Sequence, residues 1–557
     1  GADYYVDASG GNDGNAGTSV SSAWKTIGKV NGRTFSPGDR ILLKRGQVWR
    51  EQLVVPSSGV SGKPITFGAY GSGNRPVLKG SALLSGWTNS GGSLWRASLS
   101  STPNQVFFTG VRGVKVSGVS SVNGVNKWYW SGGVLYVYAT SNPGSTIEAS
   151  VRPSTRSYGL LHIQGREYVN VESIEVTQSA SFGLYIKPAA QYITVRDCEV
   201  SHALDGGLVA PSSGGVGCSQ LTIEDCLVHH NNGGFKEGAP GVATYHEGLT
   251  MERVNGFVIR RTKVYDNYME GSNFKRGAAN GLIEYCDLYS NDLINQYIEG
   301  ATNIEIRYNR IYDCSYNAGI EFGMETDTYH NDNVRIHHNL FWNNSGGVSF
   351  WAGSFTGQHR NIRIENNTFY NNWEAIRWKS GATDNYSGTN YIRNNLFWQN
   401  SASNRAIWDY TSGSQAINRT TIAYNAFQQG AASATTGSNA KLMSDPYFTG
   451  ASGLNFSLRT GSPCINTGTS VGWPADIAGI SIPQGGTPDI GAYEFASGGT
   501  PTPTSYTLSV SAANGTVAKT PNQTSYTSGA TVTLQATPNS GYTFTGWSGA
   551  VTGATNP

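Results

Sequence analysis

The chain has 557 residues, and 71 of them are glycine, about one residue in eight against a usual share of roughly 7%. Charged residues make up 14% and aromatic residues 11%, a mix that excludes helical bundles, coiled coils and charged disordered chains and favours a large all-β protein. The formal net charge is +2, and the sequence has neither a Lys/Arg stripe nor a run of 18 apolar residues, so we expect no nucleic-acid partner and no membrane span.

The first part of the chain, residues 1–164, is predicted to form an N-terminal cap together with the first coils of a stacked β structure. Residues 1–5 enter directly into a strand-like run, as the start of a processed mature protein would. Strand–turn–strand patterns at 35–46 and 63–71 fit the capped end that such stacks need. The six cysteines are too sparse for a disulfide framework, and we expect them in the core, with a Cys198–Cys226 disulfide as the alternative.

A short pattern of apolar, polar, variable, small or Asn, variable, apolar residues recurs from residue 171 to residue 427. It is seen at 195–200, 306–311 and 364–369, and it repeats mostly every 23 to 30 residues, with one step of 36. Short alternating strands at such a period indicate a solenoid of parallel β-coils, stacked at about 4.8 Å. We therefore interpret residues 165–495 as a parallel β-helix that carries the catalytic region.

The fourth position of this pattern forms a column of similar residues through the predicted stack. Asn occupies it in five successive coils, at residues 309, 339, 367, 395 and 425, whereas Cys198, Cys226 and Cys286 occupy it in earlier coils. An amide at a bend can bond the same amide one coil above and below. The sequence therefore predicts a buried Asn ladder.

These coils resemble the right-handed parallel β-helix proteins of the pectate-lyase-like superfamily. The resemblance also rests on the stretch at 7–14, on the Pro37-Gly38-Asp39 turn and on the segments at 462–465 and 488–494, and it covers about residues 1–495. It implies an all-β, right-handed parallel β-helix solenoid. The superfamily holds lyases, hydrolases, epimerases and adhesins, so the resemblance implies a carbohydrate-active protein without fixing the reaction.

The C-terminal part reads as a linker followed by a second, smaller β domain. Residues 496–505 are Thr- and Pro-rich and predict an extended linker. Residues 506–557 resemble the internalin B-repeat modules that are appended to secreted bacterial enzymes, and we expect the module to be truncated at its end. This resemblance implies export, to the outside of the cell or to its surface.

Two columns of polar residues follow the strands that open successive coils, because residues alternate between the core and the outside of a strand. The first column is Thr250, Asn273, Tyr297, Glu321, Ser349 and Arg377, and the second is Glu252, Lys275, Glu299, Gly323, Trp351 and Lys379. We predict that they form one exposed face, about 25–30 Å long, able to hold several sugar units.

Glu299 and Glu321 are the leading catalytic candidates on this face. They lie on adjacent coils with an offset of two residues, a separation that suits the paired carboxylates of retaining and inverting glycosidases. Lys275, between Glu252 and Glu299 in its column, would keep a neighbouring carboxylate ionised, and Glu325 is the substitute for either acid. A solvated salt-bridge ladder is the alternative for this column.

Several further residues are predicted to bind the substrate. Tyr297, Trp351 and Trp408 offer flat faces to sugar rings, Glu252, Asn273, Arg377 and Lys379 offer polar contacts, and His246 lies in an insertion beside the face. No metal ligand spacing is diagnostic, and the proposed chemistry needs no cofactor, with Ca²⁺ on the Glu325/Asp327 loop as an alternative.

Three functions remain open from the sequence. The leading hypothesis is a secreted, monomeric glycoside hydrolase that acts on a polysaccharide or an oligosaccharide with Glu299 and Glu321. The second is a polysaccharide lyase acting on a uronate polymer such as alginate or pectate, in which Lys275 or His246 abstracts a proton, Tyr297 assists the leaving group, and cations such as Arg276 bind carboxylates. The third is a carbohydrate-binding solenoid without turnover.

Overall fold

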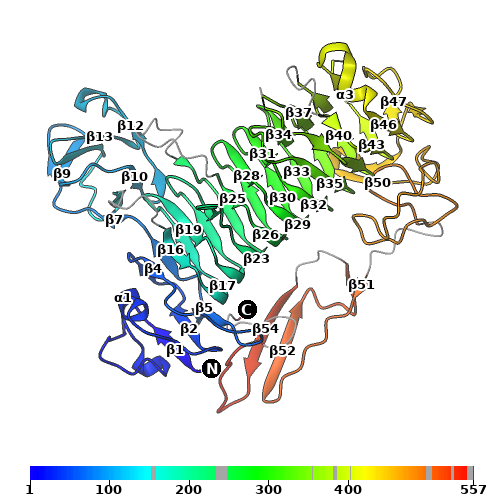
Figure 1. Ribbon diagram of the computed structural model, residues 1–557. Helices are drawn as coiled ribbons and strands as arrows, with labels where there is room; N and C mark the ends of the chain where they lie inside the picture. The colour runs from blue at the N-terminus through cyan, green and yellow to red at the C-terminus, as the bar shows by residue number, and fades with distance from the viewer. Residues whose placement is uncertain are drawn as a thin grey trace. The chain divides into compact units, whose positions relative to one another are not determined.

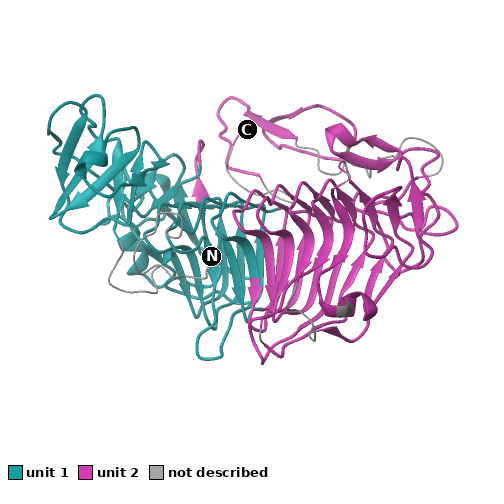
Figure 2. Cartoon of the chain, turned by 90° about the horizontal axis from the view of Figure 1, so that it is seen from above, with its two compact units in different colours: residues 1–68, 75–254, 262–273 teal, residues 69–74, 255–261, 274–557 magenta. Residues whose placement is uncertain are grey.

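The computed structural model of the protein describes residues 1–151, 159–233, 247–353, 355–379, 386–399, 401, 403–496, 505–527, 532–547 and 556. Most regular structure is β, and three long parallel sheets of 15, 13 and 11 strands dominate it (Figure 1). We call them sheets I, II and III in that order. Each repeat of the sequence contributes one short strand to each sheet, so the predicted all-β parallel solenoid is confirmed. The chain divides into two compact units (Figure 2).

Unit 1 comprises residues 1–68, 75–254 and 262–273. Its strands of sheet I are β1 (Asp3–Val6), β2 (Arg40–Lys44), β5 (Ile65–Tyr70), β17 (Glu167–Glu172), β20 (Gln191–Arg196) and β23 (Ser219–Glu224). Those of sheet II are β3 (Val48–Trp49), β6 (Val77–Lys79), β18 (Glu175–Thr177), β21 (Glu199–Ser201), β24 (Leu227–His229) and β27 (Lys263–Tyr265). Those of sheet III are β4 (Leu53–Val54), β16 (Gly159–Gln164), β19 (Phe182–Lys187), β22 (Leu208–Ala210) and β25 (Leu249–Glu252). Helix α1 (Ile27–Asn31) is capped by the Thr26 side chain.

Two small, mostly antiparallel sheets in unit 1 have no counterpart in the sequence-based interpretation. One contains β7 (Ala82–Leu83), β10 (Gln105–Phe108), β11 (Val111–Arg112) and β15 (Ile147–Ser150). The other contains β8 (Thr88–Asn89), β9 (Leu94–Ser98), β12 (Val114–Lys115), β13 (Lys127–Ser131) and β14 (Val134–Tyr138). Gly132 and Gly133, both at positive φ, form the two-residue hairpin turn between β13 and β14, a signal that was present in the sequence.

Unit 2 comprises residues 69–74, 255–261 and 274–557. Its strands of sheet I are β26 (Asn255–Arg260), β29 (Ala279–Glu284), β32 (Thr302–Arg307), β35 (Asn331–His337), β39 (Arg363–Glu365), β43 (Asn390–Arg393) and β46 (Thr420–Ala423), with β38 (His359–Arg360) and β42 (Tyr386–Ser387) alongside. Those of sheet II are β30 (Asp287–Tyr289), β33 (Arg310–Tyr312), β36 (Leu340–Trp342), β40 (Thr368–Tyr370), β44 (Leu396–Trp398), β47 (Ala426–Gln428) and β48 (Lys441–Met443). Sheet III continues with β31 (Ile294–Glu299), β34 (Ala318–Gly323), β37 (Gly346–Phe350), β41 (Glu374–Trp378) and β45 (Arg405–Asp409), and its strand β28 (Glu270–Lys275) ends with two residues of this unit. Helix α3 (Gln415–Asn418) is short.

The core of unit 2 consists of stacked identical or similar side chains. Phe341, Phe369, Phe397 and Phe427 stack in sequence with ring centroids 4.7, 5.1 and 5.0 Å apart. Beside them the predicted Asn ladder is confirmed: each amide from Asn309 to Asn395 donates to the Oδ1 of the next Asn at 3.0–3.1 Å. All six cysteines are free and buried, as expected for core residues, and the alternative Cys198–Cys226 disulfide is not formed.

Part of sheet II in unit 2 is covered by the segment that carries β49 (Phe448–Gly450) and β50 (Asn455–Leu458). Residues Phe456, Cys464, Ile490 and Ala492 of this segment pack in one buried cluster with Trp342 and Leu396 of sheet II. The C-terminal module has two two-stranded antiparallel sheets, β51 (Ser505–Tyr506) with β53 (Tyr526–Thr527) and β52 (Gly515–Thr520) with β54 (Thr533–Pro538). Among the described residues, none of the helices has the length and apolar character needed to cross a membrane.

Candidate functional site

Sheet III places the two predicted columns in the expected register. Tyr297 pairs with Glu321 between β31 and β34, Glu321 pairs with Ser349 of β37, and Ser349 pairs with Arg377 of β41. In the second column, Glu299 pairs with Gly323. The backbone N–H groups of Trp351 and Lys379, each donating to the preceding coil, extend that column. Glu299 and Glu321 therefore lie on adjacent strands with an offset of two residues, as predicted.

The prediction that these columns form an exposed face is wrong. Every residue of β31 and β34 is buried, and Glu299 and Glu321 are each only 3% exposed. Burial arises because long polar side chains stack on those of the next coil, and because residues from the flanking segments, Asn317 and Glu325, bond to them. The exposed or half-buried members of the site are Glu325, Trp351 and Lys379, which form a rim above a buried floor.

Glu299 is a buried acid with an unfilled hydrogen-bonding position. Burial raises the pKa of its carboxyl group, and the nearby Glu325 raises it further, whereas Lys275 opposes the rise. Its Oε1 atom makes no hydrogen bond within the part of the chain that the structure describes. A buried carboxyl group with a raised pKa and an oxygen without a hydrogen bond favours the protonated form, which a general acid needs.

Glu321 has the opposite surroundings, because cations and an amide hold its carboxylate. The ammonium group of Lys379 lies 2.5 Å from Oε1, and the Asn317 amide donates to Oε2. Burial raises the pKa of Glu321, while Lys379 and Arg377 counteract that rise by favouring the ionised form. The ion pair with Lys379 favours a carboxylate at this position, suited to a base or a nucleophile.

Tyr297 connects the two acids of the floor to the rim. Its hydroxyl donates to Glu325 Oε1 at 3.0 Å, and the Lys275 ammonium lies 5.2 Å from the centre of its ring. The ring occupies the space beside Gly323, where an added Cβ would lie 1.7 Å from the Tyr297 hydroxyl oxygen. A glycine at position 323 is therefore required for the Tyr297 side chain to keep this position and its bond to Glu325.

Four further residues of the site were missed by the sequence analysis: Asn317, Glu374, Arg405 and Tyr410. Asn317 accepts from both Lys379 Nζ and Arg377 Nη2, at 2.6 and 3.0 Å, besides donating to Glu321. Glu374 accepts from Arg377, Arg405 and the Tyr410 hydroxyl. Asn317 lies in a turn outside the repeated pattern and carries no signal. Glu374, in contrast, lies on the same strand as Arg377, and the pairing of an acid with that cation could have been considered.

The remaining predicted binding residues have separate surroundings. Glu252 and Asn273 belong to unit 1, where Glu252 accepts from the backbone N–H and the hydroxyl of Ser212, and Asn273 donates to Glu270. His246 lies outside the described residues. Trp408 pairs with Arg377 across β41 and β45, and its ring is covered by the Arg405 guanidinium at 4.2 Å.

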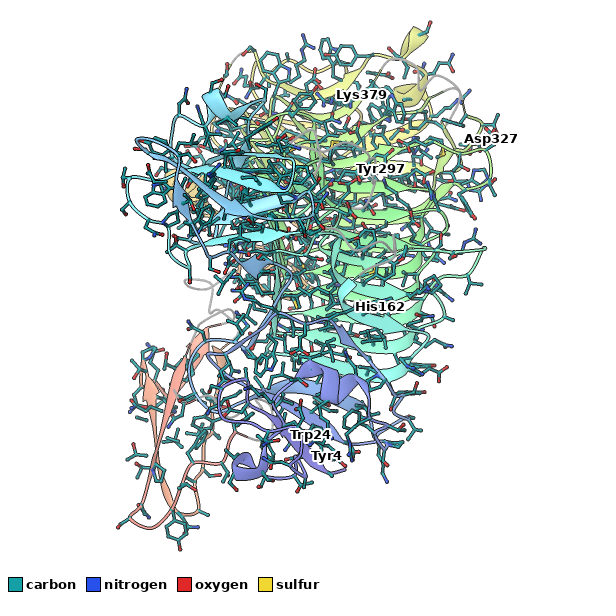
Figure 3. All side chains as sticks on the ribbon, turned by 90° about the vertical axis from the view of Figure 1, so that its left-hand side faces the viewer. Tyr4, Trp24, His162, Tyr297, Asp327 and Lys379 are labelled. Carbon is teal, nitrogen blue, oxygen red and sulfur yellow. The ribbon has the colours of Figure 1, made fainter. Side chains whose placement is uncertain are left out.

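The Glu325/Asp327 loop directs its two carboxylates to different partners. Asp327 accepts from the backbone N–H and hydroxyl of Thr356 at 2.7 and 2.9 Å, and it lies at the edge of the view in Figure 3, whereas Glu325 bonds Tyr297. Within the described residues, no group of three or more His, Cys, Asp or Glu side chains is arranged to hold a metal ion. The described contacts thus assign both carboxylates to protein partners.

Comparisons with known proteins agree with this architecture. The family model described as "Right handed beta helix region" matches residues 109–246 and 241–358, and the "Divergent InlB B-repeat domain" matches residues 506–557. Among solved structures, XylC in complex with xylose is 16% identical, covering 80% of this chain and 87% of that one with a TM-score of 0.52. Pectate lyase Pel9A is also 16% identical, covering 89% of this chain and 96% of that one with a TM-score of 0.46.

A curated relative matches a short stretch of the chain. It is the lacto-N-biosidase of Bifidobacterium longum subsp. longum, 38% identical over 84 residues, or 14% of this chain. The chain spans about 5% of the length of that relative. The family models thus confirm the fold and the C-terminal module that were expected from the sequence. The reaction is inferred below from the chemistry of the site.

Proposed function

We propose that this chain, a right-handed parallel β-helix protein with a divergent InlB B-repeat domain, is a glycoside hydrolase acting on an oligosaccharide or a polysaccharide. The observation that carries the proposal is the contrast between Glu299 and Glu321 on adjacent strands. One carboxyl group is buried with an open oxygen, and the other is paired with Lys379. The partial similarity to a protein named lacto-N-biosidase agrees in kind with this proposal.

In the proposed reaction, Glu299 is the general acid and Glu321 is the nucleophile or the base. Glu299 donates its proton to the glycosidic oxygen as the bond to the anomeric carbon breaks. The Glu321 carboxylate either attacks that carbon or takes a proton from the attacking water. An offset of two residues on adjacent strands places the two Cα atoms about 7–8 Å apart, and side-chain rotation covers the separations of both mechanisms. Trp351, which is half-buried, offers an aromatic face to a sugar ring.

The proposal is tested by incubating the purified chain with a panel of neutral and acidic polysaccharides and oligosaccharides and analysing the products. Glu299→Gln and Glu321→Gln should each lower turnover about 10²–10⁴-fold on any substrate that is cleaved. Glu284→Gln is the matched control, because Glu284 is a buried carboxylate held by Arg307 outside the site. If both variants keep wild-type turnover, the site is not catalytic, and a binding solenoid becomes the better interpretation.

A lyase is the second candidate, and one observation favours it. The Lys275 ammonium lies over the Tyr297 ring beside Glu299, and Arg377 and Lys379 add cations nearby, so a uronate carboxyl could bind near a base and an acid. Lyase products contain an unsaturated ring that absorbs ultraviolet light. If ultraviolet absorbance increases on alginate or pectate, and Lys275→Met abolishes the increase, the protein is a lyase and not a hydrolase.

Secretion and a monomeric state remain predictions. The B-repeat domain supports export, because it resembles the modules that are appended to secreted bacterial enzymes. Fractionation of the producing cells and size-exclusion chromatography with light scattering test the two predictions separately.

A further inference from the structure

A polar hollow of unit 2 lies outside the candidate site. It has a volume of about 750 Å³ and is formed where four successive coils turn from sheet II into sheet III. Its lining includes Ser315, Ser345, Asn343, Asn371, Asn404 and Trp373, and the described residues that line it are uncharged, with the carboxylate of Asp313 bonded to Asn343 at one end. The hollow is therefore a place where neutral hydrogen-bonding groups meet one aromatic ring.

One side of the hollow is a row of hydrogen-bonded amides. Asn343 donates to Asp313 at 3.1 Å, Asn371 donates to Asn343 at 2.9 Å, and Asn404 donates to Asn371 at 3.2 Å. Each of these bonds uses one of the two N–H groups of an amide. Asn343 is exposed and Asn371 is half-buried, and both have positive φ angles, 54° and 53°. The row thus fixes the orientation of amides that can still bond a ligand.

The other side is a column in which an aromatic residue follows two small ones. At this turn the backbone N–H of Cys314 donates to Asn344 Oδ1, and that of Asn344 donates to Asn372 Oδ1, so the next residues, Ser315, Ser345 and Trp373, lie above one another. Trp373 is 47% exposed, although burial of its ring would be favourable. The two serines leave open the space beside the indole, which produces a hollow with a flat apolar wall.

We propose that this hollow is an accessory binding site for a neutral glycan, separate from the acids of the candidate site. A sugar ring has apolar faces that stack on an indole and hydroxyl groups that bond amides, whereas the described lining has no cation to pair with the carboxylate of a uronate. Trp373 directly precedes Glu374 of β41, the strand that carries Arg377. A glycan held here lies at the start of a strand of the candidate site, an arrangement that would retain a polymeric substrate. This last step rests on the proposed function, whereas sugar binding by the hollow does not.

Affinity electrophoresis tests the proposal, with arabinoxylan, galactan, galactomannan or polygalacturonate cast into native gels. All proteins carry Glu299→Gln, so that turnover does not remove the polysaccharide. We expect retardation by at least one neutral polysaccharide and about tenfold weaker binding after Trp373→Ala. Ser345→Tyr, which keeps Trp373 and fills the hollow, should weaken binding similarly. Thermal denaturation of each variant verifies that it is folded.

Tyr285→Ala is the matched control, because Tyr285 is 45% exposed and lies at the other turn of its coil, between sheets I and II. It should leave retardation unchanged. The proposal is overturned if the folded Trp373→Ala and Ser345→Tyr variants are retarded as strongly as the wild type. It is also overturned if only polygalacturonate retards the protein, or if no polysaccharide does. If the proposed hydrolase is wrong, the protein that keeps Glu299 will show no turnover. That result leaves the gel experiment unaffected.

Discussion

The Asn ladder and the candidate site are both columns of buried polar side chains in unit 2, but they differ in how their hydrogen bonds are satisfied. In the ladder, identical amides repeat from coil to coil, and each donates to the next amide and accepts from the preceding one. In the site, successive coils carry Tyr297, Glu321, Ser349 and Arg377, and Glu299 has an oxygen without a hydrogen bond in the described structure.

This difference separates stabilisation from chemistry within one architecture. Repetition of one residue lets every polar group be satisfied, which rigidifies the fold. A change of residue at each coil places acids and cations within contact of each other at a cost in stability, because burying charge is unfavourable unless it is paired. Columns that repeat are thus interpreted as structural, and columns that vary are interpreted as functional.

The largest effect is expected from breaking the ladder. Asn367→Ala removes the acceptor for two bonds from Asn339 and the donor to Ile336 and Asn395, all of them buried. We expect a loss of about 2–4 kcal/mol in the free energy of unfolding, measured by urea denaturation. The turnover of the remaining folded protein should be unchanged.

The control for this variant is Asn303→Gly, which removes an exposed amide at a φ of 56° without backbone strain. It should change the free energy of unfolding by less than about 1 kcal/mol. Equal losses in the two variants would contradict the structural role assigned to the inner ladder.

Much of the ladder and less of the site could be predicted from the sequence. The register of Glu299 and Glu321 follows from strand alternation and from the repeat, since both are local properties. The burial of the face could not be predicted, because it depends on Asn317 and Glu325, whose flanking segments follow no period. Glu374 and its partners Arg405 and Tyr410 were missed for a related reason: their contacts are made between coils by long side chains.

The next largest effect is expected at the ion pair of the site. Lys379→Met leaves the Glu321 carboxyl buried without its cation, so its pKa rises further. A base or nucleophile must be ionised, so the acidic limb of the pH–rate profile should move to higher pH. Turnover at neutral pH should fall about 10–100-fold. Lys441→Met, at an exposed cation, is the control, and an unshifted acidic limb in Lys379→Met would remove Glu321 from the proposed role.

A smaller loss is expected when the space beside Tyr297 is filled. Gly323→Ala places a Cβ 1.7 Å from the Tyr297 hydroxyl oxygen, so the ring must move away from Glu325. We expect turnover to fall about tenfold, or about 1.4 kcal/mol in activation free energy, with little change in melting temperature. Gly453→Ala, where an added Cβ contacts nothing within 4 Å, serves as the control. Unchanged turnover in Gly323→Ala would mean that the position of Tyr297 does not matter for the reaction.

The smallest effect distinguishes the buried Glu299 from the half-buried Glu305 by the sign of their pH dependence. Burial raises the folded-state pKa of Glu299, so its contribution to stability is fully present below the unfolded pKa and is lost as pH rises through the folded pKa. Glu299→Gln, which stays neutral, should therefore become more stable relative to wild type as pH rises.

Glu305 should behave in the opposite way, because the hydrogen bond from His337 lowers its pKa. Its contribution is present above the unfolded pKa and is lost as pH falls through the folded pKa, so Glu305→Gln should be least stable relative to wild type at neutral pH. Melting temperatures of the three proteins between pH 4 and pH 8 measure both slopes. If the melting temperatures of the two variants relative to wild type change with pH in the same direction, Glu299 is ionised in the folded protein. The site would then not differ from the satisfied polar columns in the protonation of its acid.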